Sequence, residues 1–389
     1  MPFVISPARS QKQHLVGKPS QGSSSWPWLC FAFGGIVLFF YCNPLIASFS
    51  RVKPNLGGAN AISTSVTGGT GSFQLAAGSM DVHWNEGALD CSRNPQPPLQ
   101  VHQYDARTFI LRENPCATFE APFMYLLVGS TKAVLIDTGD IADPNRMPLA
   151  KTVLNLLPGD GPAKLPLLVV HTHRHLDHRA GDGQFAHLAN VEVVGYDIDS
   201  VRRYYKLANW PDGLTQIDLG DRIVDVIPTP GHSETAICFY DRNTGLLFSG
   251  DFLLPGRLLI DDAKAARASA ERVADFVKDR PVSFVLGGHI EMNSAGELYS
   301  WGSQYHPQEH TLQMTKNDLL ALPAAIGGFN GLYTVRGNFI MENSIRILIL
   351  GGLLAVALLG AGVWMLIRHL RRRKRLQASM ENRSQQFAR

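Results

Sequence analysis

The fold and the chemistry of this chain depend on the stretch Thr172-His-Arg-His-Leu-Asp-His-Arg-Ala-Gly181. Four of its residues have metal-binding side chains: His173, His175, Asp177 and His178. A continuous apolar run at residues 165–170 comes immediately before this stretch and is typical of a buried strand. Loops that follow such strands often carry site residues, because the rigid strand holds them in place. We therefore expect a functional site at the end of this strand.

The residue types and their spacing indicate metal binding. Imidazole nitrogens and carboxylate oxygens are the ligands that zinc prefers. A spacing of two lets His173 and His175 point the same way from an extended backbone. The adjacent pair Asp177 and His178 cannot share that direction, which indicates a second metal beside the first. A single histidine on a loop is usually a solvated or core residue, but four such residues at this spacing favour a metal site.

The composition of the whole chain excludes one broad class of function. The chain has 389 residues and a formal net charge of +3, which does not suggest nucleic-acid binding. Much of the positive charge lies near the C-terminus, at Arg368 and in the run 371–375. We therefore expect no nucleic-acid partner, and the C-terminal charges need a separate explanation.

The apolar run from Ile347 to Ile367 predicts a transmembrane helix. It contains no charged residue and is long enough to cross a bilayer. All faces of such a helix would be apolar, which is unfavourable for a helix in a soluble core. Because basic residues follow at once, the positive-inside tendency predicts a cytoplasmic C-terminal tail. The residues before the helix are then expected to be extracytoplasmic.

The N-terminus predicts the export step that this topology requires. Arg9, Lys12 and Lys18 precede an apolar stretch from Trp28 to Cys42. This order resembles a signal peptide or an uncleaved signal anchor. No convincing A-x-A cleavage site follows closely, which favours the anchor.

The five cysteines fall into different settings. Cys91 and Cys116 flank a hydrophilic, proline-rich segment, and in an oxidising compartment we expect them to pair. Such a bridge would contribute roughly 3 kcal/mol through its closed loop. Two free thiols are the alternative. Cys238 lies in a strand-like run and is predicted to be a small core residue.

Short apolar runs alternate with helical patterns through the middle of the chain, and hairpins also occur. The expected strands are 123–128, 133–136, 165–170, 191–194, 223–228, 236–240, 246–249 and 284–286, and the expected helices are 147–157, 198–207 and 263–277. This order predicts a mixed α/β (α+β) layered domain. Ligand-type residues follow several of these runs: Asp137, His173, His232, Asp251 and His289. We expect them to meet at one edge of a β-sandwich.

With these motifs, the chain resembles the metallo-β-lactamase-fold hydrolase superfamily over roughly residues 100 to 295. The resemblance implies an αββα sandwich with a two-metal site between its sheets. It also implies a role for each site residue. The implied roles are His173, His175 and His232 on one zinc, Asp177, His178 and His289 on the other, Asp251 bridging both, and Asp137 orienting the loop and a ligand histidine.

The resemblance implies a hydrolase with two zinc ions per chain, although iron or manganese would fit the same residues. A metal-bridging hydroxide would attack an ester, thioester, lactone or related bond in a small-molecule substrate. Asp177 could take the proton of the attacking water. Asp251 narrows the subclass, because true β-lactamases of this fold usually carry Cys or Ser there. A bridging Asp is similar to the glyoxalase II branch.

Two other functions use the same residues. One is an iron-dependent, persulfide-type dioxygenase, whose branch shares much of the motif. The other is a non-catalytic scaffold that the metal stabilises, but a structural site needs only four ligands and no open position.

Further polar residues near the motif have two readings each. His306 and His310 line the site or bind metal, or else lie on the surface. His171 is expected to be a neighbour of the ligands rather than a ligand. Arg174 and Arg179 meet an anionic substrate or are simply solvated.

The sequence thus predicts seven segments. They are a basic tail (1–25), a signal peptide or anchor (26–49), a flexible linker (50–80), the metallo-β-lactamase-fold domain (81–299), a C-terminal extension (300–344), a transmembrane helix (345–367) and a basic cytoplasmic tail (368–389).

Overall fold

The computed structural model describes residues 74–161 and 164–387. The expected basic tail, the export segment and residues 50–73 of the expected linker lie outside the described residues. The remaining linker residues contact the domain. The Ala76 N–H donates to the Asn243 carbonyl at 2.8 Å, and Met80 packs against the core.

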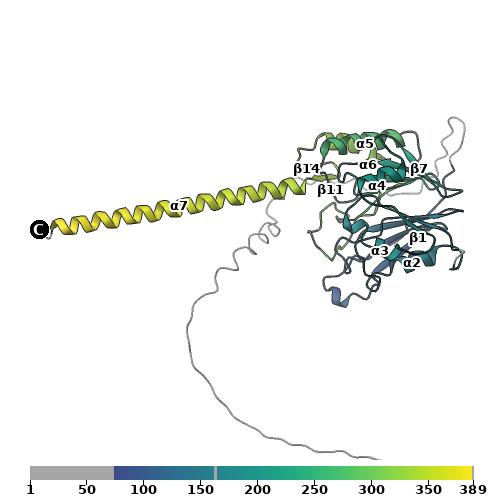
Figure 1. Ribbon diagram of the computed structural model, residues 1–389, viewed down its shortest axis with the longest axis horizontal. Helices are drawn as coiled ribbons and strands as arrows, with labels where there is room; N and C mark the ends of the chain where they lie inside the picture. The colour runs from purple at the N-terminus through teal and green to yellow at the C-terminus, as the bar shows by residue number, and fades with distance from the viewer. Residues whose placement is uncertain (1–73, 162–163, 388–389) are drawn as a thin grey trace, which may run out of the picture. The chain divides into compact units, whose positions relative to one another are not determined.

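Two six-stranded sheets face each other and form the centre of the domain (Figure 1). The strands of the first sheet, in spatial order, are β1 (Leu99–Asp105), β2 (Thr108–Glu113), β3 (Phe123–Val128), β4 (Ala133–Ile136), β5 (Leu167–Val170) and β6 (Val191–Val193). Those of the second are β13 (Gln313–Met314), β12 (Phe284–Gly287), β10 (Leu246–Gly250), β9 (Ile237–Asp241), β8 (Ile223–Pro228) and β7 (Thr215–Asp218). Pairs β4–β5, β5–β6 and β10–β12 are parallel, and the others are antiparallel.

Helices cover the outer face of each sheet. Those on the first sheet are α2 (Leu149–Leu156) and α3 (Asp182–Phe185), and those on the second are α5 (Ala263–Val277) and α6 (Lys316–Gly327). The short helix α4 (Ile198–Tyr205) packs against the core between the sheets. This arrangement confirms the predicted αββα sandwich.

The central strands are buried on both faces, which explains their continuous apolar sequences. Every residue of β3, β4 and β5 is buried. Between the sheets, the rings of Tyr125 and Phe248 lie 4.5 Å apart, one from each sheet. The outer faces pack against helices, as α5 shows with its buried stripe of Ala266, Ala270 and Val273. This packing holds the loops at the strand ends in fixed positions.

The expected C-terminal extension is folded onto the domain. It contains α6 and two strands, β14 (Tyr333–Arg336) and β15 (Phe339–Glu342). These strands form a small sheet with β11 (Arg257–Leu259), in the order β11–β15–β14. The extension therefore pairs directly with the domain through β11.

A long helix, α7 (Ser344–Phe387), follows β15 and includes the expected transmembrane segment. Among the described residues, its part Ser344–Gln385 is long and apolar enough to cross a membrane, and the apolar window is 0% buried. The helix continues through the basic cluster.

The cysteines in the described residues behave in two ways. Cys91 and Cys116 form a disulfide whose Cα atoms lie 5.2 Å apart. Cys238 is a buried free thiol in β9, as expected for a core residue.

A buried ion pair ties the two sheets together. Arg222, on the turn before β8, is 1% exposed and binds both carboxylate oxygens of Asp241, at 3.0 and 2.7 Å. Its remaining N–H groups donate to the Arg107 carbonyl at 2.9 Å and to Thr108 Oγ1 at 2.7 Å, beside and within β2. The guanidinium therefore bonds to both sheets.

We predict that Arg222→Ala lowers the free energy of unfolding by about 3–5 kcal/mol, because it leaves the Asp241 carboxylate buried without its partner. Urea denaturation followed by circular dichroism would measure this. Arg267→Ala is the control, since it removes a pair with Glu271 whose side chains are 58% and 53% exposed, and should cost under about 1 kcal/mol. Equal losses in both variants would contradict the prediction.

Candidate metal centre

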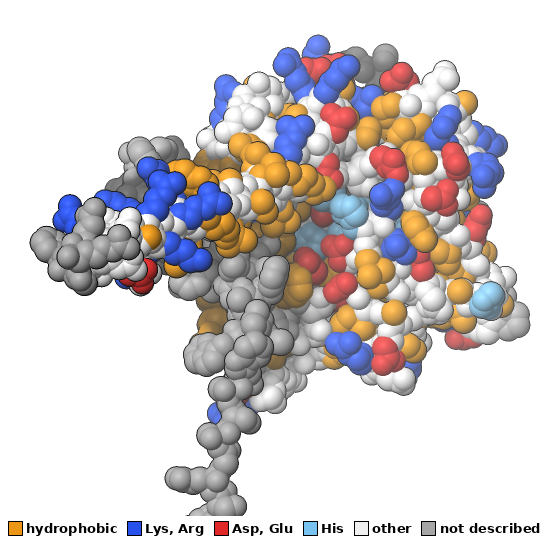
Figure 2. Space-filling model, turned by 60° about the vertical axis from the view of Figure 1, so that its left-hand side comes forward, with side chains coloured by type: hydrophobic (Ala, Val, Ile, Leu, Met, Phe, Trp, Pro, Cys, Tyr) orange, Lys and Arg blue, Asp and Glu red, His pale blue; other side chains and the backbone are white. Residues whose placement is uncertain are grey.

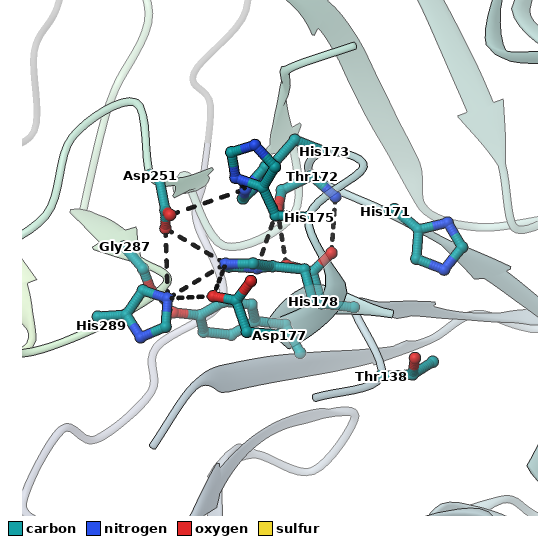
Figure 3. A network of polar contacts seen from close by, with 12 residues as sticks. Thr138, His171, Thr172, His173, His175, Asp177, His178, Asp251, Gly287 and His289 are labelled. Carbon is teal, nitrogen blue, oxygen red and sulfur yellow. Dashed lines mark hydrogen bonds and ion pairs between the residues drawn. The ribbon is translucent and has the colours of Figure 1, made fainter. Parts of the chain in front are cut away.

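The ends of five strands bring eight polar side chains together (Figure 3 shows most of them). Asp137 follows β4, and the cluster of His173, His175, Asp177 and His178 follows β5 in the first sheet. In the second sheet, the site residues that follow β8, β10 and β12 are His232, Asp251 and His289. The site therefore lies where both sheets end, as their sequence positions predict.

The ligand-type atoms form two compact groups, and within each group they lie within 4.8 Å of one another. The first group is His173, His175 and His232, and the second is Asp177, His178, Asp251 and His289. The structure thus brings together all seven predicted ligands.

In the second group, the outer hydrogen bonds of the histidines determine which nitrogen faces inward without a proton. His178 Nδ1 lies 2.9 Å from Asp137 Oδ2, and His289 Nδ1 lies 2.7 Å from the Glu120 carbonyl oxygen. Both oxygens are acceptors, so we assign the proton of each neutral ring to Nδ1. The two Nε2 atoms then face each other with their lone pairs, only 3.1 Å apart. Such an arrangement fits a cation held between them.

The first group converges in the same way. His232 Nδ1 faces the Leu259 carbonyl oxygen at 3.0 Å, so its Nε2 is unprotonated in the neutral ring. His173 Nε2 and His232 Nε2 both lie 3.0 Å from His175 Nδ1. One proton on His175 cannot satisfy two acceptors in different directions. Three convergent imidazole nitrogens are a suitable donor set for zinc.

Asp251 lies between the groups and presents one oxygen to each. Its Oδ2 is 3.7 Å from His173 Nε2 and 3.4 Å from His232 Nε2. Its Oδ1 is 3.4 Å from His178 Nε2 and 3.6 Å from His289 Nε2. This oxygen is buried and has no hydrogen-bond partner. An unpartnered buried carboxylate oxygen is costly, and a metal ion would satisfy it.

Charges inside the site move several pKa values. Burial lowers the pKa of His173 well below its usual value, and the nearby His178 adds to this effect. Burial also acts to lower the pKa of His289, but Asp251 and Asp177 outweigh it and raise that pKa to about 10. For Asp251, burial acts to raise the pKa, but His178 and His289 hold it well below the usual range. The carboxylates thus favour a positive charge in this site, either as a proton on His289 or as a metal ion that displaces this proton and meets the neutral ring.

Asp137 holds the start of the ligand loop in place. Its Oδ1 accepts the Thr172 N–H at 2.7 Å, and its Oδ2 accepts from Thr172 Oγ1 at 2.7 Å as well as from His178. Its backbone has a φ of +66°, a left-handed conformation that Asp adopts more readily than most residues. The carboxylate therefore fixes both the loop and the tautomer of His178.

The backbone comes close to the site at Gly288. A Cβ atom at this position would lie 2.5 Å from Asp251 Oδ1 and 2.7 Å from His178 Cε1. The site therefore requires glycine beside His289.

The other polar residues that the sequence singled out lie outside both groups. His171 bonds to Asp182 at 2.8 Å, and His306 is buried between Glu309 and the Ser303 carbonyl. His310 is exposed. Arg174 pairs with Glu234, and the Arg179 guanidinium lies 3.7 Å from the centre of the Tyr196 ring.

Several supporting groups have no signal in the sequence. The carbonyls of Glu120 and Leu259 orient two histidines, and any residue type supplies a carbonyl. Glu113 is buried at the end of β2, and its Oε1 sits where a Cβ of Gly139 would be. Its other oxygen accepts the Asp140 N–H at 3.2 Å. Glu113 therefore packs beneath the loop that carries Asp137.

We predict a pH-dependent effect of Glu113→Gln on stability. Burial raises the pKa of Glu113 from its usual 4.5 to about 8. The folded protein therefore holds a proton that the unfolded chain releases, and this contribution to stability is lost as pH rises towards 8. Between pH 5 and 8, the stability of the wild type should fall relative to the variant by up to about 1.4 kcal/mol per pH unit. Urea denaturation at several pH values measures this.

Glu271→Gln provides the control, because this carboxyl is exposed. A constant difference between wild type and Glu113→Gln from pH 5 to 8 would contradict the prediction.

On the surface, histidine side chains lie in a hollow with acidic side chains around it and hydrophobic side chains beside it (Figure 2). The site is therefore accessible from outside the domain. Asp177 contributes to this access, since its side chain is 22% exposed whereas that of His178 is fully buried.

The sequence of this chain is similar to those of known proteins. The family model of the metallo-beta-lactamase superfamily matches residues 117–289. Acyl-coenzyme A thioesterase MBLAC2 is 31% identical in Gallus gallus, over 215 residues, and in Homo sapiens, over 217 residues; both alignments cover 47% of this chain and 77% of the relative. A hydroxyacylglutathione hydrolase of Maricaulis maris is 28% identical over 208 residues, which cover 53% of this chain and 74% of that protein. The chain therefore belongs to the metallo-β-lactamase superfamily of metal-dependent hydrolases.

Proposed function

We propose that the chain is a dinuclear zinc hydrolase that cleaves thioesters, or esters and lactones of similar shape. The observation that carries this proposal is Asp251, whose two oxygens face two separate ligand groups and whose Oδ1 has no hydrogen-bond partner. A single ion would leave one of these groups without a cation.

Under this proposal, each group holds one zinc. The residues are His173, His175 and His232 on the first ion, Asp177, His178 and His289 on the second, and Asp251 on both. Nitrogen-rich sites with carboxylates favour zinc, although iron or manganese would also fit the donor set. The bound ions would supply water of lowered pKa and polarise the substrate carbonyl.

Asp177 is the residue best placed to move a proton. Its Oδ2 lies 3.3 Å from both His178 Nε2 and His289 Nε2, and its side chain reaches the opening of the site. Burial acts to raise the pKa of Asp177, but His178 and His289 outweigh it and hold that pKa well below its usual range. The lowered pKa keeps Asp177 ionised. Because Oδ2 faces the ligand nitrogens and would bind the second ion, the other oxygen, Oδ1, would accept the proton of the attacking water.

The thioester is our first choice of substrate. The relatives carry the names acyl-coenzyme A thioesterase and hydroxyacylglutathione hydrolase, and both substrates join an acyl group to a thiol. The proposed bridging residue is Asp251, and a bridging Asp is also what the resemblance to the glyoxalase II branch implies.

We also propose that α7 anchors the chain in a membrane, with the catalytic domain exported and the basic tail in the cytoplasm. Exposed apolar side chains along the helix support this, for example Val356 at 70% and Leu359 at 69% exposure. The basic residues after Ile367 support the orientation. The disulfide suits an oxidising compartment.

Asp251→Asn tests the bridging role. It keeps the size of the side chain but removes its charge and one anionic oxygen. Loss of such a ligand should reduce thioester hydrolysis by at least the roughly 10–100-fold that is typical of changes next to a ligand. Metal content, measured by elemental analysis, should fall from two ions towards one per chain. Full activity with two bound ions would rule out the bridge, and unchanged circular dichroism would show that the fold is intact.

Asp137→Asn tests the support of the ligand loop. The amide cannot accept from both Thr172 and His178 as the carboxylate does, so His178 loses its fixed tautomer. We predict roughly 10–100-fold weaker zinc binding in a competition assay with a chelator. Asp182→Asn is the matched control, because Asp182 bonds to His171 outside both ligand groups. Similar zinc affinity in both variants would contradict the assigned role.

Protease protection tests the topology. Added to intact cells or spheroplasts that express the chain, protease should digest the catalytic domain and spare a tag on the C-terminal tail, because only the domain lies outside. Lysed cells provide the control in which the tail is also accessible. Protection of the domain in intact cells would reverse the proposed orientation.

A further inference from the structure

The junction between the domain and α7 is fixed by a single buried residue, Asn343, which is 4% exposed. Its Nδ2 donates to the Ile260 carbonyl at 2.8 Å, just beyond β11. Its Oδ1 accepts the Arg346 N–H at 2.9 Å in the first turn of α7. Strand β15 therefore passes into the helix without a flexible linker. The first turn of α7 and the small sheet therefore lie side by side.

Strand β14 and the residue before it expose apolar side chains at this junction. Leu332, Tyr333 and Val335 are 37%, 46% and 59% exposed. The Leu332 carbonyl accepts the Asn343 N–H at 2.8 Å, so these residues lie directly beside the start of α7. Single exposed apolar residues are common on soluble proteins, but here they adjoin a helix of transmembrane length. Tyrosine is also enriched where membranes meet water.

Tyr333 and Val335 alternate along β14 and share one face of the β11–β15–β14 sheet. Val335 pairs with Ile340, which pairs with Arg257. Cross-strand partners point to the same side of a sheet, and alternate residues point to the other side. The intervening residues Phe339 and Met341 pack into the core beneath the sheet. Val335, Ile340 and Arg257 therefore lie on the opposite face, which is exposed at Val335 in the edge strand and covered at Ile340 and Arg257, at 8% and 9% exposure.

Arg257, at the covered end of this face, lies near the metal site. The Arg257 guanidinium lies 4.7 Å from the centre of the Trp301 ring and 3.5 Å from Glu291. These residues and Glu120 line one hollow. The Glu120 carbonyl accepts from His289, so the hollow adjoins the second ligand group.

A second set of contacts gives the distance between the metal site and β15. His232 Nδ1 lies 3.0 Å from the Leu259 carbonyl, and Leu259 pairs with Glu342 at the end of β15. Because neighbouring strands lie about 4.8 Å apart, the His232 ring lies roughly 10 Å from the β15 backbone. The apolar run from Ile347 to Ile367 matches the roughly 30 Å hydrocarbon core, so its edge lies close after Ser344. The metal site would thus lie close to the bilayer surface.

We propose that the edge strand β14, through its exposed residues Tyr333 and Val335, rests on the bilayer surface beside α7. The substrate is then an amphiphile whose apolar chain stays in the lipid while its thioester or ester carbonyl reaches the metal site past Arg257 and Trp301. Transfer of such a chain from lipid into water is unfavourable for each CH₂ group, and this placement avoids that transfer. The inference rests on the proposed anchor and hydrolase.

Spin labels on the full chain in phospholipid vesicles test the surface. The spin label is attached to the cysteine of the variant Val335→Cys. Cys30→Ser and Cys42→Ser remove two other thiols that the label could modify. Val356→Cys in α7 is the lipid control. Leu214→Cys is the water control, because Leu214 is 50% exposed and precedes β7, at the far end of the domain from β14 (Figure 1). We expect the label at position 335 to be more accessible to oxygen and less accessible to a nickel chelate than that at 214.

Three results would contradict the proposed contact between β14 and the bilayer. Equal accessibility at positions 335 and 214, with position 356 in lipid, leaves the anchor intact and removes this inference. A water-exposed label at position 356 removes both. Spin–spin broadening at position 335 would show that a second copy of the chain covers the face instead.

Kinetics of the double variant Tyr333→Asp/Val335→Asp test the substrate class. The two substrates are a long-chain acyl thioester embedded in vesicles and a water-soluble acetyl thioester. We expect kcat/KM to fall about tenfold with the embedded substrate, equivalent to about 1.4 kcal/mol, and to stay within about twofold with the soluble one. Leu214→Asp should change neither value.

Equal losses with both substrates would show that β14 supports the fold rather than a lipid contact, and the inference would fail. A wild-type protein that hydrolyses only the soluble substrate would retain the proposed hydrolase but exclude the amphiphile. A wild-type protein that hydrolyses neither would remove the proposed function and the substrate class together.

Discussion

The structure depends on histidine nitrogens that converge beside carboxylates inside the sandwich. His178 Nε2 and His289 Nε2 are 3.1 Å apart, and outer hydrogen bonds to Asp137 and to the Glu120 carbonyl place the proton of each ring on the opposite nitrogen. Such an arrangement is repulsive unless a cation occupies its centre. Metal binding and the geometry of the strand ends are therefore coupled.

The αββα sandwich provides the rigid frame for this coupling. Fully buried strands such as β4 and β5 end at the site, and the loop after β5 is held by the Asp137 carboxylate. The second sheet contributes His232, Asp251 and His289 from three of its strands. Ties between the sheets, such as Arg222 with Asp241 and Thr108, keep the two halves of the site in register.

Much of this could be predicted from the sequence, because short apolar runs mark the central strands and ligand-type side chains follow them. The small β11–β15–β14 sheet could not, since it pairs Arg257 with Ile340, far along the chain. Helix α6 is hard to predict, because Pro323 lies inside it and proline normally ends a helix. The carbonyls of Glu120 and Leu259, which orient two histidines, leave no trace in residue type.

The most direct test of the account is the position of the metal ions. Anomalous diffraction at the zinc edge, on crystals of the zinc-loaded protein, should show two peaks with the Asp251 carboxylate between them. One peak should lie among His173, His175 and His232, and the other among Asp177, His178 and His289. A single peak, or an Asp251 carboxylate that contacts only one ion, would contradict a dinuclear centre.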